Sequence, residues 1–475
     1  MTEIHEGDSE SEPELSKPER SPGAKFLLVI LMGFLITIPL LTVWALNYDR
    51  QSQSETAKQS ITSAWGGKQV FAGPKIVLPY QAKISESVEE NGKTVTRTNT
   101  VTRELFVAPD KIELASDLSP ETKSRSIYEV ILYNTNVTGS ATFILPDDLD
   151  RYGVTKDQID FSRAELRFGL SDARGLAGDN KVTVNGEAAK LQPGKGLGET
   201  GNSGFFAFVD GAVLADGEIK ADFDVRFKGH QSLTVVPHAG QTNWSVKSKW
   251  PHPSFVGSFL PKSEVKPTGF QADYDIANLA LGKSLISTEP GQIVNAVTEA
   301  DRIYYPEGVQ SGANSSVTVD LIDPVDLYSQ VDRATKYGFL IIGFTFVAFL
   351  LFDLIGGIRI SSVQYILVGV ALVLFFVLLL AFAEIIGFAL AYVAASIGTI
   401  GLITAYSASV LSSWRKASII GGLLAALYGA IYILLSLEAY SLLIGSLLIF
   451  AALAGVMYVT RRLDWSSSLK RPKIG

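Results

Sequence analysis

Six long apolar stretches and one long polar region divide the 475-residue chain. The first apolar stretch runs from Phe26 to Leu46. Five more follow the polar region: Tyr337–Leu354, Val363–Phe382, Ile386–Tyr406, Ala417–Leu435 and Tyr440–Thr460. A helix needs about 20 apolar residues to cross the hydrocarbon layer of a bilayer. The pattern therefore predicts six transmembrane helices, of which the last five form a bundle.

The first apolar stretch resembles a signal peptide only in its position. Its apolar run exceeds the usual length of a signal-peptide core, which is about 7–15 residues, and no clear small-x-small cleavage site follows it. We therefore expect an uncleaved anchor helix. Pro39 lies inside it, which neighbouring helices can accommodate.

The polar region between the first two spans has the patterns of β-strands. Ala221–Lys228 alternates apolar and polar residues strictly, as a half-buried strand does. Asn91-Gly92, Asn185-Gly186 and Asp216-Gly217 suit tight hairpin turns. Further predicted strands are Thr94–Thr102, Ser126–Leu145, Ala164–Leu170, Lys181–Val184, Phe205–Val209 and Thr242–Lys249. We expect a large, mainly antiparallel, sandwich-like β domain, with short helices at Glu55–Ser63 and Tyr274–Leu281.

The distribution of Lys and Arg in the short loops predicts the orientation. Arg359, Arg415–Lys416 and the segment after Thr460 lie on one side of the spans, while the opposite loops carry Glu384 and Glu438 and no Lys or Arg. Loops rich in Lys and Arg remain cytoplasmic. The predicted organisation of a bacterial inner-membrane protein follows: a disordered acidic cytoplasmic tail (1–24), an anchor helix (25–46), a periplasmic β domain (47–336), a transmembrane bundle (337–460) and a basic cytoplasmic tail (461–475).

Composition and motifs exclude several functions. The net charge is −7 and no segment is basic enough for a nucleic-acid footprint. The absence of cysteine excludes disulfides, thiol catalysis and Cys-based metal sites. His230, His238 and His252 lack the close spacing of a metal site. Two Ser-x-x-Lys motifs, Ser413–Lys416 and Ser467–Lys470, are excluded as catalytic sites that act on the cell wall, because they lie on the side away from it. We expect no catalytic residue, no metal and no cofactor.

A rigid aromatic segment is the first candidate for recognition. It spans Trp250–Phe255, and its candidate residues are Trp250, His252, Pro253 and Phe255. Two prolines fix φ in this segment and so hold its aromatic rings rigidly. The segment is interpreted either as a recognition loop for a partner or envelope component, or as a packed corner of the β domain.

Polar residues at the edges of the spans are the second group of candidates. Glu384 and Glu438 lie at the outer edges, where a carboxylate reaches water. Charged groups near the midplane, which an ion relay needs, are absent from the apolar stretches, so a lipid or apolar-solute carrier remains open but a charge-coupled transporter is disfavoured. Arg333 and Lys336 precede the second span, where they either bind lipid head groups or remain hydrated.

Several ordered motifs resemble the CreD family of inner-membrane proteins. They are Ser63–Gln69, Gly73–Tyr80, Arg125–Val130, Leu170–Gly175, Trp250–Pro261, Pro324–Gly338, Val363–Gly369, Ala383–Phe388, Glu438–Ser446 and Thr460–Trp465. The resemblance implies a link to cell-envelope integrity and envelope stress, with no catalytic residue to carry over. Our main hypothesis is a non-enzymatic stress-response protein whose β domain binds a partner or cell-wall component. The alternatives are a transporter or lipid-handling protein acting through the bundle, and an enzyme with an unrecognised outer site.

Overall fold

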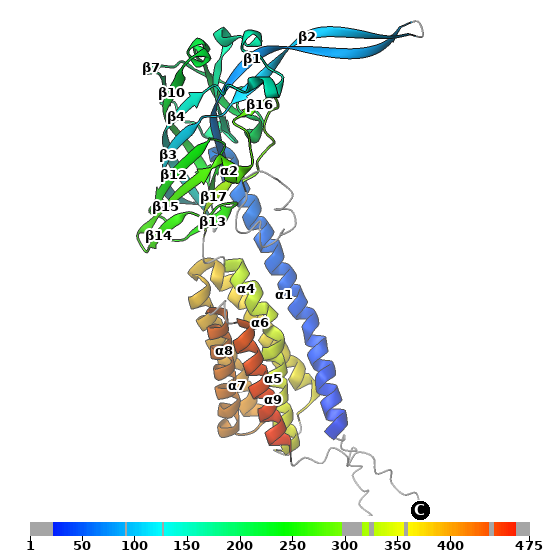
Figure 1. Cartoon of the computed structure of the whole chain (residues 1–475). Coiled ribbons are helices and arrows are strands. Elements are labelled where there is room, and N and C mark those ends of the chain that lie inside the picture. Colours follow the sequence, from blue (N-terminus) through cyan, green and yellow to red (C-terminus); the bar gives the residue numbers. More distant parts are fainter. Residues whose placement is uncertain are drawn as a thin grey trace, which may run out of the picture. The chain divides into compact units, whose positions relative to one another are not determined.

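The computed structural model describes residues 22–90, 93–125, 128–296, 316–322, 327–355, 360–436 and 441–461. The chain forms two compact units (Figure 1). The helical unit comprises Met1–Ser52 and Val325–Gly475, and the β unit comprises Gln53–Pro324. Both predicted tails lie mostly outside the described residues.

Helices make up the helical unit, most of them apolar. They are the first part of α1 (Pro22–Trp65), α4 (Leu327–Lys336), α5 (Gly338–Ile355), α6 (Ser362–Ile386), α7 (Phe388–Val410), α8 (Trp414–Ser436) and α9 (Ser441–Thr460). Within the described ranges, five helices are long and apolar enough to cross a membrane: α1, α4 continued by α5, α6, α7 and α8. The sixth predicted span coincides with α9, and its crossing of a membrane stays a prediction.

Helix α1 continues beyond the apolar run that predicts the anchor. The apolar run stops at Leu46, but the helix continues to Trp65 and includes the segment predicted as a separate short helix, Glu55–Ser63. Residues 47–65 are polar, yet they contain no Gly or Pro that would interrupt helical hydrogen bonding. Gly66, with φ +146°, follows the last helical residue. An apolar pattern predicts the part of a helix that lies in lipid. The end of the helix is set by the backbone, here at Gly66.

Small residues allow the helices of this unit to approach closely. A Cβ atom placed on Gly369 of α6 would lie 2.6 Å from Ile36 Cγ1 of α1, and one on Gly421 of α8 would lie 2.5 Å from Thr404 Oγ1 of α7. Such contacts leave no room for a side chain at either glycine. They are typical of helices that associate by packing in lipid.

The β unit contains two mixed sheets. Sheet A has the order β13-β17-β11-β1-β5-β9-β8, with β2 paired to β1 and to β16; sheet B has the order β14-β15-β12-β3-β4-β10-β6-β7. The strands of sheet A are β1 (Gln69–Glu90), β2 (Lys93–Val107), β5 (Glu165–Leu170), β8 (Leu191–Pro193), β9 (Gly204–Phe208), β11 (Ser232–Val236), β13 (Pro253–Gly257), β16 (Ile286–Ser287) and β17 (Val317–Leu321). The strands of sheet B are β3 (Lys111–Arg125), β4 (Tyr128–Ile144), β6 (Lys181–Val184), β7 (Glu187–Ala188), β10 (Glu218–His230), β12 (Gln241–Ser248), β14 (Lys262–Lys266) and β15 (Gly269–Ala277).

The expectation of an antiparallel domain holds for most strand pairs but not for all. Parallel pairs join β1 to β11 in sheet A and β3 to β12 in sheet B. In both cases the partners are far apart in sequence. Alternation of apolar residues reveals which face of a strand is buried but carries no information on the direction of its neighbour, so the sequence pattern could not predict this mixture.

One hydrophobic core joins the two sheets. It includes Phe71 and Phe168 from sheet A together with Tyr133, Phe223 and Trp244 from sheet B. Phe168 stacks on Phe205 at 4.8 Å between ring centroids and meets Phe223 edge-on at 5.3 Å. This core accounts for the alternation in β10, whose apolar residues are buried and whose polar residues remain accessible, as predicted for Ala221–Lys228.

The other predicted strands also coincide with observed strands. One of the two predicted short helices is mostly extended instead. The expected helix Tyr274–Leu281 begins as strand β15, and only α2 (Asn278–Leu281) is helical. Tyr274 stacks on Trp244 of the neighbouring strand at 5.0 Å, and this core contact fixes the extended conformation of the segment. Tertiary packing therefore decides the structure where local propensity is weak.

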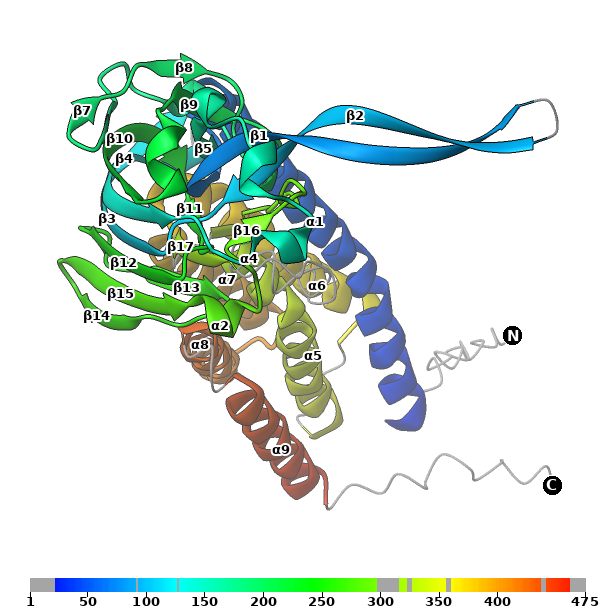
Figure 2. The same cartoon turned by 45° about the horizontal axis from the view of Figure 1, so that its top comes forward.

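Strands β1 and β2 continue together beyond the body of the β unit as a two-stranded ribbon (Figures 1 and 2). Their antiparallel ladder runs from Ile76 opposite Val107 to Glu90 opposite Lys93. Strand β5 accompanies β1 only as far as Val77. In the described part of the chain, the ribbon therefore consists of these two strands over most of its length.

Candidate functional site

The aromatic segment predicted for recognition packs partly against the core of the β unit. Trp250 Nε1 donates to the carbonyl oxygen of Ile322 at 2.8 Å, and Phe255 meets Phe270 edge-on at 5.9 Å. Pro253 begins β13, which pairs with β17, while His252 is exposed. The structure thus brings Trp250 and Phe255 to the edge of the core and leaves His252 as the accessible side chain. A recognition role for this segment stays a prediction.

Two of the sequence motifs meet where α1 ends and β1 begins. Asp172 accepts hydrogen bonds from the backbone N–H of Gly67 at 3.1 Å and from Arg174 Nη2 at 2.8 Å. The hydrogen bond from Arg174 is the main reason why the pKa of Asp172 lies below its ordinary value. Gln69 Nε2 donates to the carbonyl oxygen of Asp172 at 3.1 Å. These contacts give Ser63–Gln69 and Leu170–Gly175 a shared structural role.

The ring of Trp65 lies in the same region and contacts two cations. Lys123 Nζ lies 3.7 Å and Lys228 Nζ 4.2 Å from a ring centroid of Trp65. Cations over an indole face are attracted by its quadrupole. The last residue of α1 is therefore held by side chains of sheet B, within the β unit.

A buried ionic cluster lies beside the start of β1. Lys75 forms an ion pair with Glu199, and both side chains are largely buried. Burial raises the pKa of Glu199, but the Lys75 ammonium outweighs this effect and lowers the pKa below its ordinary value. Burial, and next the Lys75 charge, lower the pKa of His238 to about 4. Its ring nitrogens lie 2.9 Å from the Val236 carbonyl oxygen and 3.2 Å from that of Pro74.

This cluster is enclosed by the chain itself. The backbone N–H of Val294 donates to the carbonyl oxygen of Glu199 at 2.8 Å. A Cβ atom on Gly291 would lie 2.2 Å from Glu199 Cδ, so no side chain fits there. The described residues contain no group of three or more His, Asp or Glu side chains placed to hold a metal ion. The cluster therefore has the form of an internal ion pair rather than of an open site.

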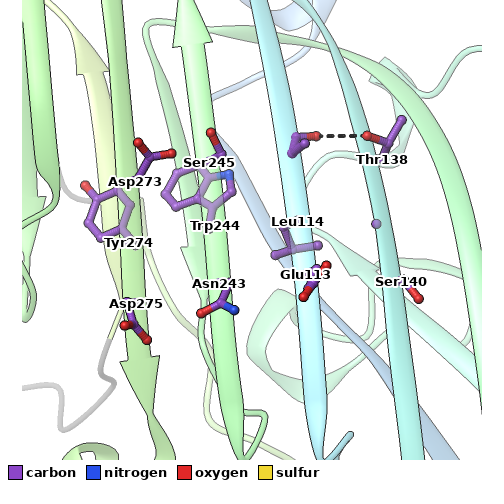
Figure 3. A pocket seen from close by; sticks show the side chains of 12 residues that line it. Glu113, Leu114, Thr138, Ser140, Asn243, Trp244, Ser245, Asp273, Tyr274 and Asp275 are labelled. Atoms are coloured by element: carbon purple, nitrogen blue, oxygen red, sulfur yellow. Dashed lines mark hydrogen bonds between the residues drawn. The ribbon is translucent and has the colours of Figure 1, made fainter.

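A hollow of about 560 Å³ crosses four strands of sheet B (Figure 3). Its lining follows three cross-strand rows on β15, β12, β3 and β4. The rows are Asp275, Asn243, Glu113 and Ser140; Tyr274, Trp244, Leu114 and Gly139; and Asp273, Ser245, Ala115 and Thr138. The side chains of Tyr274, Trp244 and Leu114 in the middle row belong to the core, and the outer rows are exposed or half-buried.

The accessible rows combine carboxylates with small polar side chains. Glu113 forms an ion pair with Lys111 at 2.7 Å, and the hydrogen bond from Lys111 lowers the pKa of Glu113. Asp275 accepts a hydrogen bond from Gln241, and Asp273 accepts one from Gln271 Nε2 at 3.4 Å. Carboxylates accept several hydrogen bonds at once. The hollow can therefore bind groups that donate hydrogen bonds, such as hydroxyls or amines.

In the helical unit, Glu384 lies in a polar cluster near the end of α6. Tyr328 Oη donates to Glu384 Oε1 at 3.2 Å, and Arg50 Nε of α1 lies 3.9 Å from the same oxygen. Asn47 of α1 donates to the Tyr328 carbonyl oxygen at 3.2 Å. The carboxylate of Glu384 is thus mostly enclosed, although the sequence position predicted contact with water.

A second polar contact joins α1 to α5 at the other end of α1's apolar part. Lys25 Nζ of α1 lies 2.8 Å from Asp353 Oδ1 of α5, and Asp353 is buried. Helix α1 is therefore bound to the other helices by a charged contact at each end of its apolar part. We call the Lys25–Asp353 contact and the Arg50–Glu384–Tyr328 cluster the two polar latches.

The remaining predicted edge residues have different positions. Lys336 is exposed and forms an ion pair with Asp332 one helical turn earlier, at 2.7 Å. Arg333 is half-buried at the end of α4, where the helix meets α5. Glu438 lies outside the described residues. Lipid binding by Arg333 and Lys336 stays a prediction.

Sequence reasoning missed the hollow, the buried ionic cluster and the partners of the latches. The partners of each latch are distant in sequence: Lys25 and Asp353 are separated by 328 positions. One signal was available, because charged residues beside apolar stretches often pair with one another. The hollow had no such signal, since its lining becomes continuous only when four strands are aligned.

Comparison with known proteins identifies the family of the chain. The family model described as "Inner membrane protein CreD" matches residues 21–466. The chain is 30% identical to Inner membrane protein CreD of Escherichia coli (strain K12) over 435 residues, which cover 91% of each protein. The match spans both units, including α1 and the apolar helices. The chain therefore belongs to the CreD family of inner membrane proteins.

Proposed function

We propose that the protein maintains cell-envelope integrity by binding an envelope component through its β unit, without catalysing a reaction. The helical unit serves as the membrane anchor in this proposal. The family resemblance supports the link to the envelope, and the hollow on sheet B supports the binding role. The hollow is the observation on which the proposal depends.

The proposal includes a topology with six membrane spans. The two termini are cytoplasmic, and residues 47–336 are periplasmic. Lys and Arg in alternate short loops support this orientation, because such loops stay in the cytoplasm. With this topology the hollow on sheet B opens to the periplasm, where envelope material is present.

The chemistry of the hollow favours a ligand rich in hydrogen-bond donors. Its accessible rows present Glu113, Asp273 and Asp275 together with Asn243. Sugar hydroxyls and ammonium groups of cell-wall material or of a basic protein segment fit this lining. Catalysis is not part of the proposal, because the buried pair Lys75–Glu199 is enclosed by the chain and the carboxylates of the hollow lie on an open sheet surface.

A second candidate function is lipid handling by the helical unit. A cavity of about 290 Å³ is lined by Gln330 of α4, by the turn between α6 and α7, and by Tyr432 and Leu435 of α8. Its lining is mostly apolar, and the part that comes from the turn between α6 and α7 is close in sequence to Glu384. A lipid tail or an apolar solute fits such a lining, and Glu384 would then be a functional group.

One experiment separates the two candidates. Ser245→Trp fills the hollow from a half-buried position that faces away from the core. We expect cells that carry this variant to lose resistance to envelope stress, measured as survival in detergent, to the level of a deletion strain. Thr183→Trp is the matched control, because Thr183 is also half-buried on sheet B but lies outside the hollow.

The variant Glu384→Gln completes the design. If the hollow carries the function, Glu384→Gln retains resistance while Ser245→Trp loses it. The reverse result overturns the proposal and favours lipid handling. Membrane fractionation of each variant, and labelling of Ser245→Cys by a membrane-impermeant thiol reagent, confirm that the protein is inserted with the β unit outside.

A further inference from the structure

The ribbon formed by β1 and β2 has an extended edge along β2. In the described part of the chain, β2 pairs with β1 over its whole length, but with β16 only at Phe106 and Val107. The segment Thr98–Arg103 therefore has one strand neighbour in the ladder, and Thr98, Asn99 and Thr100 are exposed. An edge of this kind can accept a further strand by backbone hydrogen bonding.

The ribbon has little core of its own to stabilise it. One face carries Gln81, Lys83 and Ser85 opposite Thr102, Thr100 and Thr98. Its side chains bond to one another, with Gln81 and Thr102 at 3.2 Å and Ser85 and Thr98 at 3.1 Å. A two-stranded hairpin is only marginally stable in water, and additional strands stabilise it. The ribbon therefore gains most from a partner that extends its sheet.

The sequence of this edge is nearly symmetric about Thr98. From Thr94 to Thr102 it reads Thr-Val-Thr-Arg-Thr-Asn-Thr-Val-Thr. A strand with this sequence can pair antiparallel with an identical strand. Around Thr98, each threonine then lies opposite a threonine, and Val95 lies opposite Val101. Within this stretch only Arg97 opposite Asn99 departs from the symmetry, and the pairing ends where Lys93 would lie opposite Arg103.

We propose that the β2 edge binds a second copy of this chain, antiparallel, with a two-fold axis at Thr98. The two ribbons then form one four-stranded sheet. A two-fold interface uses the same surface on both subunits and therefore requires a self-complementary surface. Threonine pairs and valine pairs are favourable cross-strand neighbours, whereas an unrelated strand would not need the symmetry that this edge has. The site is separate from the hollow on sheet B.

Cysteine crosslinking tests this proposal, because the native chain contains no cysteine. Residues directly opposite in an antiparallel pair have Cα atoms about 4.5–5.5 Å apart, which is within the range of a disulfide. We expect full-length Thr98→Cys, oxidised mildly in native membranes, to form a disulfide-linked homodimer that disappears on reduction. In Thr100→Cys the two cysteines would lie about 14 Å apart in the dimer, and no crosslink is expected.

Further variants make the outcome decisive. Thr96→Cys and Thr100→Cys, expressed together, should form a heterodimer, because these positions lie opposite in the proposed register. Adding Thr98→Lys to both chains places two ammonium groups against each other on the axis, and should abolish that crosslink while leaving the exposed ribbon folded. Equal crosslinking at positions 98 and 100, no crosslink in any pair, or crosslinks to a different protein would each overturn the proposal.

Discussion

The two units of this protein bury charge in different ways. In the described helices of the helical unit, the two polar latches lie at the ends of α1's apolar part, where Asp353 is buried and Glu384 is largely enclosed while Arg50 remains partly exposed. In the β unit, the Lys75–Glu199 pair is buried within the fold, and charged side chains such as Glu113 and Asp273 lie on the accessible face of sheet B. A charge at the centre of a bilayer is expensive and one near the interface much less so, while a domain in water tolerates charges on its whole surface.

The two units also differ in how the packing of their interiors stabilises the fold. The core of the β unit forms by removing apolar side chains from water, which is the dominant favourable term in folding. Lipid tails are as apolar as leucine, so the helices of the helical unit gain mainly from packing and polar contacts. Close contacts such as Gly369 against Ile36, together with the latches, therefore matter more in that unit than apolar area does.

A pair of matched substitutions tests this difference and should give the largest change in the free energy of unfolding. Phe168 in the β unit and Phe375 in α6 are both fully buried among other aromatic rings. We expect Phe168→Ala to reduce the free energy of unfolding of the β unit by about 3–5 kcal/mol, since it loses burial and leaves a cavity. We expect a smaller loss for Phe375→Ala in the helical unit, because its unfolded reference is also apolar.

Denaturant unfolding of the full-length protein in detergent measures both variants. With Trp44, Trp414 and Trp465 of the helical unit changed to Phe, tryptophan fluorescence reports the β unit through the buried Trp244, and far-ultraviolet circular dichroism reports the helices. Equal losses of unfolding free energy in the two units would contradict the view that removing apolar side chains from water stabilises only the core of the β unit.

The next largest effect should be the change in stability of the β unit with pH. The pKa of His238 is about 4 in the folded protein, against an ordinary value of 6.5, because burial opposes its charge. Above pH 6.5 the imidazole is neutral in both states and its contribution to stability is complete. Between pH 6.5 and 4 only the unfolded chain takes up the proton, so stability should fall by up to about 1.4 kcal/mol per pH unit.

Thermal unfolding between pH 7 and 4 measures this slope. His238→Gln should flatten the slope in this window. His230, whose pKa burial also lowers to about 4, should contribute a slope of its own that remains in the variant. The lowered pKa of Glu199 acts in the same direction at lower pH, where protonation of its carboxylate removes the partner of Lys75. An unchanged slope in His238→Gln would mean that His238 is accessible to protons in the folded state.

Sequence patterns predicted the parts of this fold that depend on a single element. The apolar runs revealed the helices, because each run reflects one helix meeting one solvent, and alternation revealed strands such as β10. The end of α1 was missed because Trp65 lies beyond the apolar run. The hollow, the Lys75–Glu199 pair and the parallel strand pairs depend on which distant segments become neighbours. No local pattern in one sequence encodes that choice.

The smallest expected effect is the coupling energy of one ion pair in each of the two units. Lys25–Asp353 of the helical unit is mostly buried, with a separation of 2.8 Å, whereas Lys247–Asp117 on sheet B is exposed, with a separation of 3.2 Å. A double-mutant cycle, with each lysine changed to Met and each aspartate to Asn, gives the coupling energy of each pair from the unfolding of four proteins. The exposed pair should couple by about 0.2–1 kcal/mol, as is usual for surface ion pairs.

The latch should couple more strongly, by about 1.5–3 kcal/mol, the range for hydrogen bonds to charged groups shielded from water. Salt provides the control, because screening weakens an exposed pair and affects a buried pair much less. The coupling of Lys247 to Asp117 should therefore decrease when the salt concentration is raised, while that of Lys25 to Asp353 should persist. If the two pairs have the same coupling and the same salt response, Lys25 and Asp353 are hydrated, and they do not hold α1 to α5.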